Sequence, residues 1–306
     1  MATRLNWMPV MGRMEQKKDV IIFRGGKLAL PNQEREGTEI GLFICNKTFS
    51  EGTISTDIKF LGKSEASCAD IVLFYDPQNR YTLNAGLTYQ NLFAIRHFDT
   101  RWTIHAVAGA PNAIEAGRTY HLEASLKGST VSLKSDGVEV LRTALPFVLP
   151  QSQVGLFAVD QTDVEFRNFI VNSVKPRAFV VMQFSSPYEE VYSDVIKTVC
   201  DEEQLDVTRI DEESGPGLII QDITRAIQEA KMVIADVSPI NANVFYEVGF
   251  AHALNKPTIL LAEKGTKLPF DVSPFRTLFY ENSIGGKKKF EDGLRKYIRA
   301  SLQQKG

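Results

Sequence analysis

Residues 232–256 read Met-Val-Ile-Ala-Asp-Val-Ser-Pro-Ile-Asn-Ala-Asn-Val-Phe-Tyr-Glu-Val-Gly-Phe-Ala-His-Ala-Leu-Asn-Lys and decide the fold of the second half of the chain. The apolar run from Met232 to Ala235 is short and continuous, as in a parallel strand that helices cover on both faces. Asp236 ends this run, and Pro239 marks the turn that follows it. Because ligands of open α/β sheets bind beyond the carboxyl ends of the strands, the turn is a candidate ligand site.

A helix over about residues 244–254 follows the turn, with Asn241 or Asn243 as its N-cap. Its apolar residues recur at helical spacing, which predicts one face packed on the sheet. Glu247 lies beside that face in the expected first turn. Either the helix macrodipole favours an acidic residue there, by up to ~1 kcal/mol, or the carboxylate is catalytic. An Asn243 cap places Glu247 at the fourth helical position, whereas a capping box needs the third.

Strands and helices alternate from Arg177 onward. We expect strands at 177–184, 205–210, 232–235 and 258–261, and helices at 185–203, 219–230, 244–254 and 290–302. This order predicts a parallel sheet with right-handed crossovers. The glycine-containing loop 211–217 lacks the lysine of a phosphate-binding P-loop.

Three segments of this half carry a family resemblance: Phe179-Val-Val-Met-Gln-Phe184, Arg209-Ile-Asp-Glu212 and Asn243-Val-Phe-Tyr-Glu-Val-Gly249. Over residues 177 to about 282 the chain resembles the TIR-like, nucleoside 2-deoxyribosyltransferase-like superfamily of bacterial proteins. The resemblance implies a flavodoxin-like parallel sheet, Glu247 as the catalytic carboxylate and a role in bacterial antiviral defence. Deoxyribosyltransferases use further aspartates near the base, and Asn241 stands at one such position.

The first half consists of short apolar segments separated by turn residues. The segments are expected to be strands at 20–23, 40–45, 53–60, 71–75, 92–98, 102–108, 119–126, 130–133, 138–141, 154–159 and 164–171. Asp136-Gly137 between two of them is a hairpin signal. So many regularly spaced strands without a helix predict a β-sandwich.

The phrases Phe49-Ser-Glu-Gly-Thr-Ile-Ser-Thr-Asp-Ile-Lys-Phe60 and Gly117-Arg-Thr-Tyr-His-Leu122 resemble the concanavalin A-like lectin/glucanase jelly rolls, including laminin-G-like domains. The resulting organisation is an N-terminal segment (1–19), a sandwich (20–172), a linker (173–176) and a TIR-like domain (177–304). A carbohydrate or protein ligand is expected at the sandwich, although a lectin fold does not establish sugar binding.

Two features of the sandwich are candidates for ligand chemistry. Trp102 either stacks on a sugar or belongs to the core, and ordinary burial tendencies favour the core. Glu51 and Asp57 share a strand face without the setting that a glycosidase carboxylate pair needs, so hydrolysis is disfavoured. We therefore expect recognition or assembly from this domain.

Composition excludes several classes of protein. A net charge of −2 over 306 residues gives no basic footprint for nucleic acid. Three scattered cysteines and four histidines show no disulfide framework or metal spacing, so neither a metal nor a cofactor is expected. No apolar run approaches the ~20 residues of a membrane helix, and no signal peptide opens the sequence. We expect a cytoplasmic protein that forms homo-oligomers.

The expected site gathers residues from several strand ends around Glu247. The candidate substrate-binding residues are Gln183, Phe184, Ser185, Asp211, Asp236, Ser238, Asn243 and Tyr246. Ser238 and Tyr246 are possible ribose contacts, although a tyrosine there is more often structural. Asp236 either binds a ribose hydroxyl or caps its turn.

A carboxylate beneath a ribose stabilises or captures the oxocarbenium-like centre that forms when an N-glycosidic bond breaks. Nicotinamide leaves NAD as a neutral molecule, so one carboxylate suffices, whereas a purine usually needs a proton donor as well. NAD is thus the expected substrate. The alternatives are a nucleoside N-glycosidase or 2-deoxyribosyltransferase, and a non-enzymatic module that binds a nucleotide signal and oligomerises.

Overall fold

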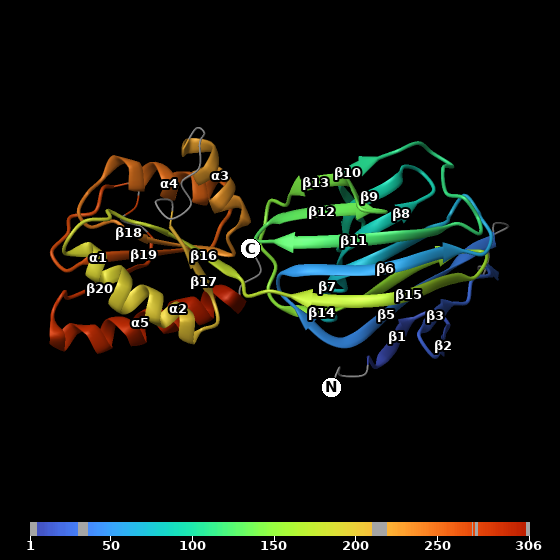
Figure 1. Cartoon of the computed structure of the whole chain (residues 1–306), viewed down its shortest axis with the longest axis horizontal. Helices are drawn as coiled ribbons and strands as arrows, with labels where there is room; N and C mark the ends of the chain where they lie inside the picture. Colours follow the sequence, from blue (N-terminus) through green and yellow to red (C-terminus); the bar gives the residue numbers. More distant parts are fainter. Residues whose placement is uncertain (1–4, 30–35, 210–218, 271, 273–274, 304–306) are drawn as a thin grey trace. The chain divides into compact units, whose positions relative to one another are not determined.

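The computed structural model describes residues 5–29, 36–209, 219–270, 272 and 275–303. The chain divides into two compact units (Figure 1). The first comprises residues 1–126, 131–143 and 151–174, and the second comprises 127–130, 144–150 and 175–306. The first is a two-sheet β-sandwich and the second is a parallel sheet with helices on both faces.

In the described part of the first unit, an eight-stranded sheet has the order β1-β5-β14-β7-β8-β9-β10, with β4 paired to β5. Its strands are β1 (Trp7–Met11), β4 (Lys27–Ala29), β5 (Glu36–Phe49), β7 (Cys68–Asp76), β8 (Tyr81–Thr88), β9 (Leu92–Phe98), β10 (Trp102–Ala108) and β14 (Ser152–Asp160). The second sheet has the order β13-β12-β11-β6-β15-β3-β2. Its strands are β2 (Met14–Lys17), β3 (Val20–Phe23), β6 (Gly52–Phe60), β11 (Thr119–Lys127), β12 (Thr130–Ser135), β13 (Val138–Ala144) and β15 (Val164–Ser173).

The alternation predicted from sequence is the basis of the sandwich core. In β6 every second side chain is buried, and Ile54, Ile58 and Phe60 are fully enclosed. Residues 1–19 are not a separate segment, as the sequence had suggested, because β1 and β2 each extend one of the two sheets. Strands β4 and β8 were not predicted from the sequence. All of β8 is buried, although it contains the weak strand formers Asn84 and Gly86.

The second unit contains a parallel sheet of order β17-β16-β18-β19-β20 within the described residues. These strands are β16 (Arg177–Val181), β17 (Asp206–Thr208), β18 (Met232–Asp236), β19 (Thr258–Glu263) and β20 (Thr277–Tyr280). Numbered along the chain, the order is 2-1-3-4-5, which is the flavodoxin-like doubly wound arrangement. The connections change direction between β16 and β18. Strand β20 was not predicted from the sequence.

Helices cover the two faces of this sheet (Figure 1). One face carries α1 (Tyr188–Val191), a π-helical turn η1 (Tyr192–Ile196), α2 (Lys197–Glu202) and α5 (Ile284–Gln303), and the other carries α3 (Ile219–Glu229) and α4 (Ala242–Ala253). The predicted helix 185–203 is therefore interrupted by a π-helical turn. The terminal helix begins six residues earlier than predicted, since Ser283 Oγ accepts a hydrogen bond from the Gly286 amide.

Candidate functional site

The change of direction between β16 and β18 places the residues after these two strands at the expected ligand edge of the sheet. After β16, Gln183 Nε2 donates a hydrogen bond to Ser185 Oγ at 2.9 Å. Ser185 is exposed and Gln183 is partly exposed, so both polar side chains reach solvent at this edge. The predicted pair is thus present at the strand end and is linked by a hydrogen bond.

Phe184 contacts Arg209, which was noted in the sequence only as the first residue of the segment Arg209-Ile-Asp-Glu212. The Arg209 guanidinium lies 4.1 Å from the centre of the Phe184 ring and 4.4 Å from that of Tyr192. Its Nη1 atom donates to Glu189 Oε1 at 2.6 Å, and only 6% of the residue is exposed. Phe184 therefore supports a buried cation between α1 and the end of β17.

Asp236, the last residue of β18, is fully buried. Its Oδ2 atom accepts a hydrogen bond from Tyr280 Oη at 2.7 Å, and its Oδ1 atom accepts one from the Ser238 amide at 2.9 Å. Burial raises the pKa of Asp236 to about 6, against the lowering effect of these hydrogen bonds, and nearby Glu263 raises it further. Both oxygens are thus engaged inside the protein, and the Ser238 bond matches the turn-capping interpretation.

Ser238 is buried as well and links two strand ends. Its Oγ atom accepts a hydrogen bond from the Glu263 amide at 2.7 Å and lies 3.1 Å from Thr266 Oγ1. With 1% of the residue exposed, the hydroxyl holds the loop after β18 to the end of β19.

Glu247 lies on α4, two residues further along the helix than an Asn243 cap would place it. Asn241 is the N-cap, because its side chain accepts a hydrogen bond from the Asn243 amide at 2.9 Å. Counting from this cap, Glu247 is the sixth helical residue, so the prediction of a first-turn carboxylate was wrong. The macrodipole weakens beyond the first turn and no longer accounts for an acidic residue here.

The Glu247 carboxylate is half-buried, and burial raises its pKa to about 7. Within the described part of the chain it has no hydrogen bond or ion pair. Val244 and Val248 on the same helix pack with Val233 and Ala235 of β18. Asp236 instead accepts a hydrogen bond from Tyr280, which packs on the face of the sheet that α5 covers. The structure therefore directs Glu247 and Asp236 to opposite faces of the sheet.

The other predicted residues lie around Glu247 or outside the described residues. Asn243 is exposed on the first turn of α4, and Tyr246 is 55% exposed, so its ring does not belong to the core. Asp211 and its loop lie outside the residues that the structure describes.

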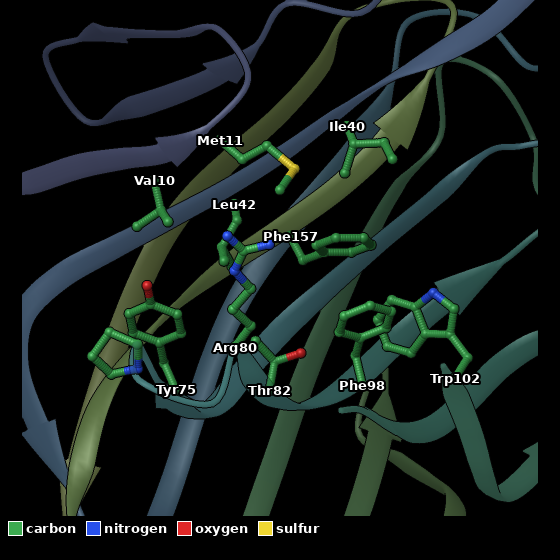
Figure 2. Close-up of a pocket in the computed structure, with 11 residues that line it drawn as sticks. Val10, Met11, Ile40, Leu42, Tyr75, Arg80, Thr82, Phe98, Trp102 and Phe157 are labelled. Atoms are coloured by element: carbon green, nitrogen blue, oxygen red, sulfur yellow. The ribbon is translucent and has the colours of Figure 1, made fainter. Parts of the chain in front are cut away.

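A pocket of about 510 Å³ lies on the eight-stranded sheet (Figure 2). Its walls are mostly apolar or aromatic and come from β1, β5, β7, β8, β9, β10, β14 and the β7–β8 turn: Val10, Met11, Ile40, Leu42, Tyr75, Pro77, Arg80, Thr82, Phe98, Trp102 and Phe157. Trp102 is 37% exposed, so the expectation that it belongs to the core was wrong. Of these residues, the sequence analysis had singled out Trp102 alone.

The second sandwich candidate, the pair Glu51 and Asp57, is not brought together as a catalytic pair. Glu51 is buried, with 2% exposed. Asp57 accepts a hydrogen bond from Asn168 Nδ2 at 2.6 Å, and its other oxygen lies 2.6 Å from His121 Nδ1. Both Asp57 oxygens are therefore engaged on the second sheet.

Among the described side chains, no group of three or more His, Cys, Asp or Glu residues could hold a metal ion. No helix in the described part of the chain is long and apolar enough to cross a membrane.

Comparison with known proteins gives likenesses to solved structures at low sequence identity. No protein family and no curated protein matches the sequence. A carbohydrate-binding module from Bacillus subtilis is 17% identical, with a TM-score of 0.44, over 53% of this chain and 92% of that chain. A β-glucanase (lichenase) derived from a mouse hindgut metagenome is 9% identical, with a TM-score of 0.39, over 55% of this chain and 92% of that chain. These likenesses concern the fold and assign no ligand.

Proposed function

We propose that the parallel-sheet domain hydrolyses the N-glycosidic bond of NAD and that Glu247 is its catalytic carboxylate. The observation that carries the proposal is the state of Glu247, which is half-buried, has a pKa raised to about 7 and has no partner among the described residues. A partly desolvated carboxylate without a partner is unfavourable for stability, and such groups concentrate at functional sites. Its helix follows β18, beside the change of strand direction where ligands of this sheet class bind.

The chemistry requires one carboxylate and one water molecule. The bond between ribose C1′ and the pyridinium nitrogen breaks, and its electron pair leaves with nicotinamide as a neutral molecule. Water adds its oxygen to C1′ and releases one proton, which gives ADP-ribose. The ionised Glu247 would stabilise the developing positive charge on the ribose or capture C1′ covalently before water attacks.

The resemblance of Asn243-Val-Phe-Tyr-Glu-Val-Gly249 to the TIR-like superfamily supports the same assignment of Glu247. It extends the proposal to a role as an effector of bacterial antiviral defence. Gln183, Ser185, Asn243 and Tyr246 have polar groups that reach solvent, and they are the proposed substrate contacts. Asp236 and Ser238 have internal partners and are proposed to hold the strand ends in place.

The test is release of nicotinamide from NAD by the purified full-length chain, at low and high protein concentration, so that dependence on self-association is also measured. Glu247→Gln keeps the shape of the side chain and is expected to abolish release. Glu190→Gln removes a carboxylate from an exposed position on α1 and serves as the matched control. A folded Glu247→Gln protein with full activity would refute the assignment.

Free base released from nucleosides, without any release from NAD, would favour the nucleoside N-glycosidase or deoxyribosyltransferase alternative. Tight nucleotide binding without turnover, together with a change of size in solution, would favour the non-enzymatic signalling module.

For the sandwich we propose recognition of a carbohydrate at the pocket on its eight-stranded sheet. The specific observation is Trp102, an exposed indole in the wall of an aromatic-lined pocket of about 510 Å³. Pockets of this size accommodate small ligands, and a flat aromatic face stacks on the apolar face of a sugar ring. Binding to an oligosaccharide array, lost in Trp102→Ala, tests this role.

A further inference from the structure

We propose that the sandwich pocket selects an acidic sugar, a ring that bears a carboxylate, and that Arg80 binds the carboxylate. This inference rests on the recognition role proposed for the sandwich. It specifies that the ligand is negatively charged and that Arg80 binds the charged group.

Arg80 is the one charged residue among those that line the pocket in the described part of the chain. It is exposed, and within the same residues its side chain forms no hydrogen bond or ion pair. Figure 2 shows the side chain reaching in among the lining residues, with its guanidinium end toward Leu42 and Phe157 in this view. A guanidinium is more weakly hydrated than an ammonium and presents two parallel donors that match a carboxylate.

The turn that carries Arg80 is built by other residues. Asp76 Oδ1 accepts a hydrogen bond from the Gln78 amide at 2.9 Å, and Asp76 Oδ2 accepts one from Asn79 Nδ2 at 2.7 Å. Arg80 itself has a φ of +51°, a left-handed conformation that glycine or asparagine adopts at lower cost. The turn therefore does not require arginine at this position.

The indole of Trp102 is fixed in place by contacts with Arg96, Phe98 and Phe157. The Arg96 guanidinium lies 4.2 Å from the centre of the ring, and Arg96 Nη2 donates to the buried Asp70 Oδ2 at 2.9 Å. Phe98 and Phe157 meet the indole edge-on, with centroids at 5.3 Å and 5.4 Å. A ring that is already immobilised loses little entropy when a sugar stacks on it.

Two hydroxyl groups in the pocket favour a sugar over a simple amphipathic acid as the ligand. Tyr75 and Thr82 line the pocket, and within the described residues neither side chain forms a hydrogen bond. A fatty acid has polar atoms at one end only and would leave both hydroxyls without a partner, which is unfavourable. A sugar acid supplies hydroxyls to Tyr75 and Thr82, a carboxylate to Arg80 and an apolar ring face to Trp102.

The test compares wild type with Arg80→Gln on an array of oligosaccharides that carry uronic or sialic acid, each paired with its carboxyl-reduced neutral counterpart. Affinities of array hits are then measured by titration calorimetry. Arg142→Gln, on β13 of the other sheet, removes the same charge and is the control. We expect Arg80→Gln to weaken binding of the acidic ligand about 10-fold or more, as for the loss of a charge-assisted hydrogen-bond pair. Binding of the neutral counterpart should be unchanged.

Equal binding of acidic and neutral sugars by both proteins would overturn the role of Arg80 and leave sugar recognition intact. Absence of any sugar binding by wild type would overturn the recognition role itself. Binding of decanoate that depends on Arg80, with no sugar bound, would replace the sugar by an amphipathic carboxylate and overturn the proposal.

Discussion

Replacing Glu247 with glutamine is expected to stabilise the parallel-sheet domain at pH 8 and to change its stability much less at pH 5. Burial raises the pKa of Glu247 from 4.5 to about 7 in the folded protein. Below pH 4.5 both folded and unfolded states are protonated, so the carboxyl group carries no penalty. As pH rises, the unfolded state loses the proton first, and the penalty is complete above pH 7.

The size of the expected stabilisation follows from the raised pKa of Glu247. Raising the pKa from 4.5 to about 7 corresponds to about 3 kcal/mol for a fully desolvated group. Because the carboxylate is only half-buried, solvent screening reduces this value, and we expect about 1–2 kcal/mol. For a domain of this size the melting temperature would rise by about 3–8 °C.

Thermal denaturation of wild type, Glu247→Gln and the exposed control Glu190→Gln at the two pH values measures the effect. A gain of similar size at both pH values, or a loss of stability at pH 8, would refute a desolvated carboxylate at this position. Stabilisation together with loss of nicotinamide release would identify Glu247 as a group kept for function at the expense of stability.

Three further outcomes are expected. For NAD cleavage, kcat/KM should rise about tenfold per pH unit below pH 7 and level off above it, since the ionised Glu247 is the active form; a profile that falls through pH 7 would instead assign a general acid. Asp70→Ala should destabilise the sandwich by about 3–5 kcal/mol in urea denaturation, because it leaves the Arg96 cation buried without its carboxylate; a loss below about 1 kcal/mol would contradict this. Asn241→Ala should reduce stability by about 1 kcal/mol through loss of the α4 cap, whereas Asn243→Ala, at an exposed position, should not.

The sequence predicted the strand and helix of residues 232–256 because both signals are local. A continuous apolar run and an apolar stripe at helical spacing were confirmed as β18 and as the buried face of α4. The position of Glu247 in the helix was missed by two residues because Asn241 and Asn243 are equally good caps in sequence. Backbone geometry decides between them, and the extended conformation of Asn241 lets its side chain reach the Asn243 amide.

The sandwich pocket was beyond sequence reasoning because its walls meet only through strand pairing. Phe157 of β14 lies beside Leu42 of β5, while Thr82 of β8 lies opposite Phe98 of β9. No local period links these residues. Trp102 was assigned to the core on ordinary burial tendencies, and alternation predicts only which residues share a face. It does not predict that this face of the sheet is left open at an edge strand.

Among the described residues of the parallel-sheet domain, Asp236 and Glu247 are carboxylates with a raised pKa, and they differ in whether a protein partner is present. Asp236 has a pKa of about 6, yet Tyr280 and the Ser238 amide occupy its oxygens, so its perturbed state is explained by the packing of the strand ends. Glu247 has a pKa of about 7 with no hydrogen-bond partner among the described residues. A polar group that is satisfied inside the protein has no need of a ligand, whereas a group without a protein partner is satisfied by water or by a ligand that displaces the water. The same distinction applies in the sandwich, where Arg96 is bound to Asp70 and Arg80 is not bound to any described residue. In both domains, then, the group without a partner among the described residues is the one that we propose to contact the ligand.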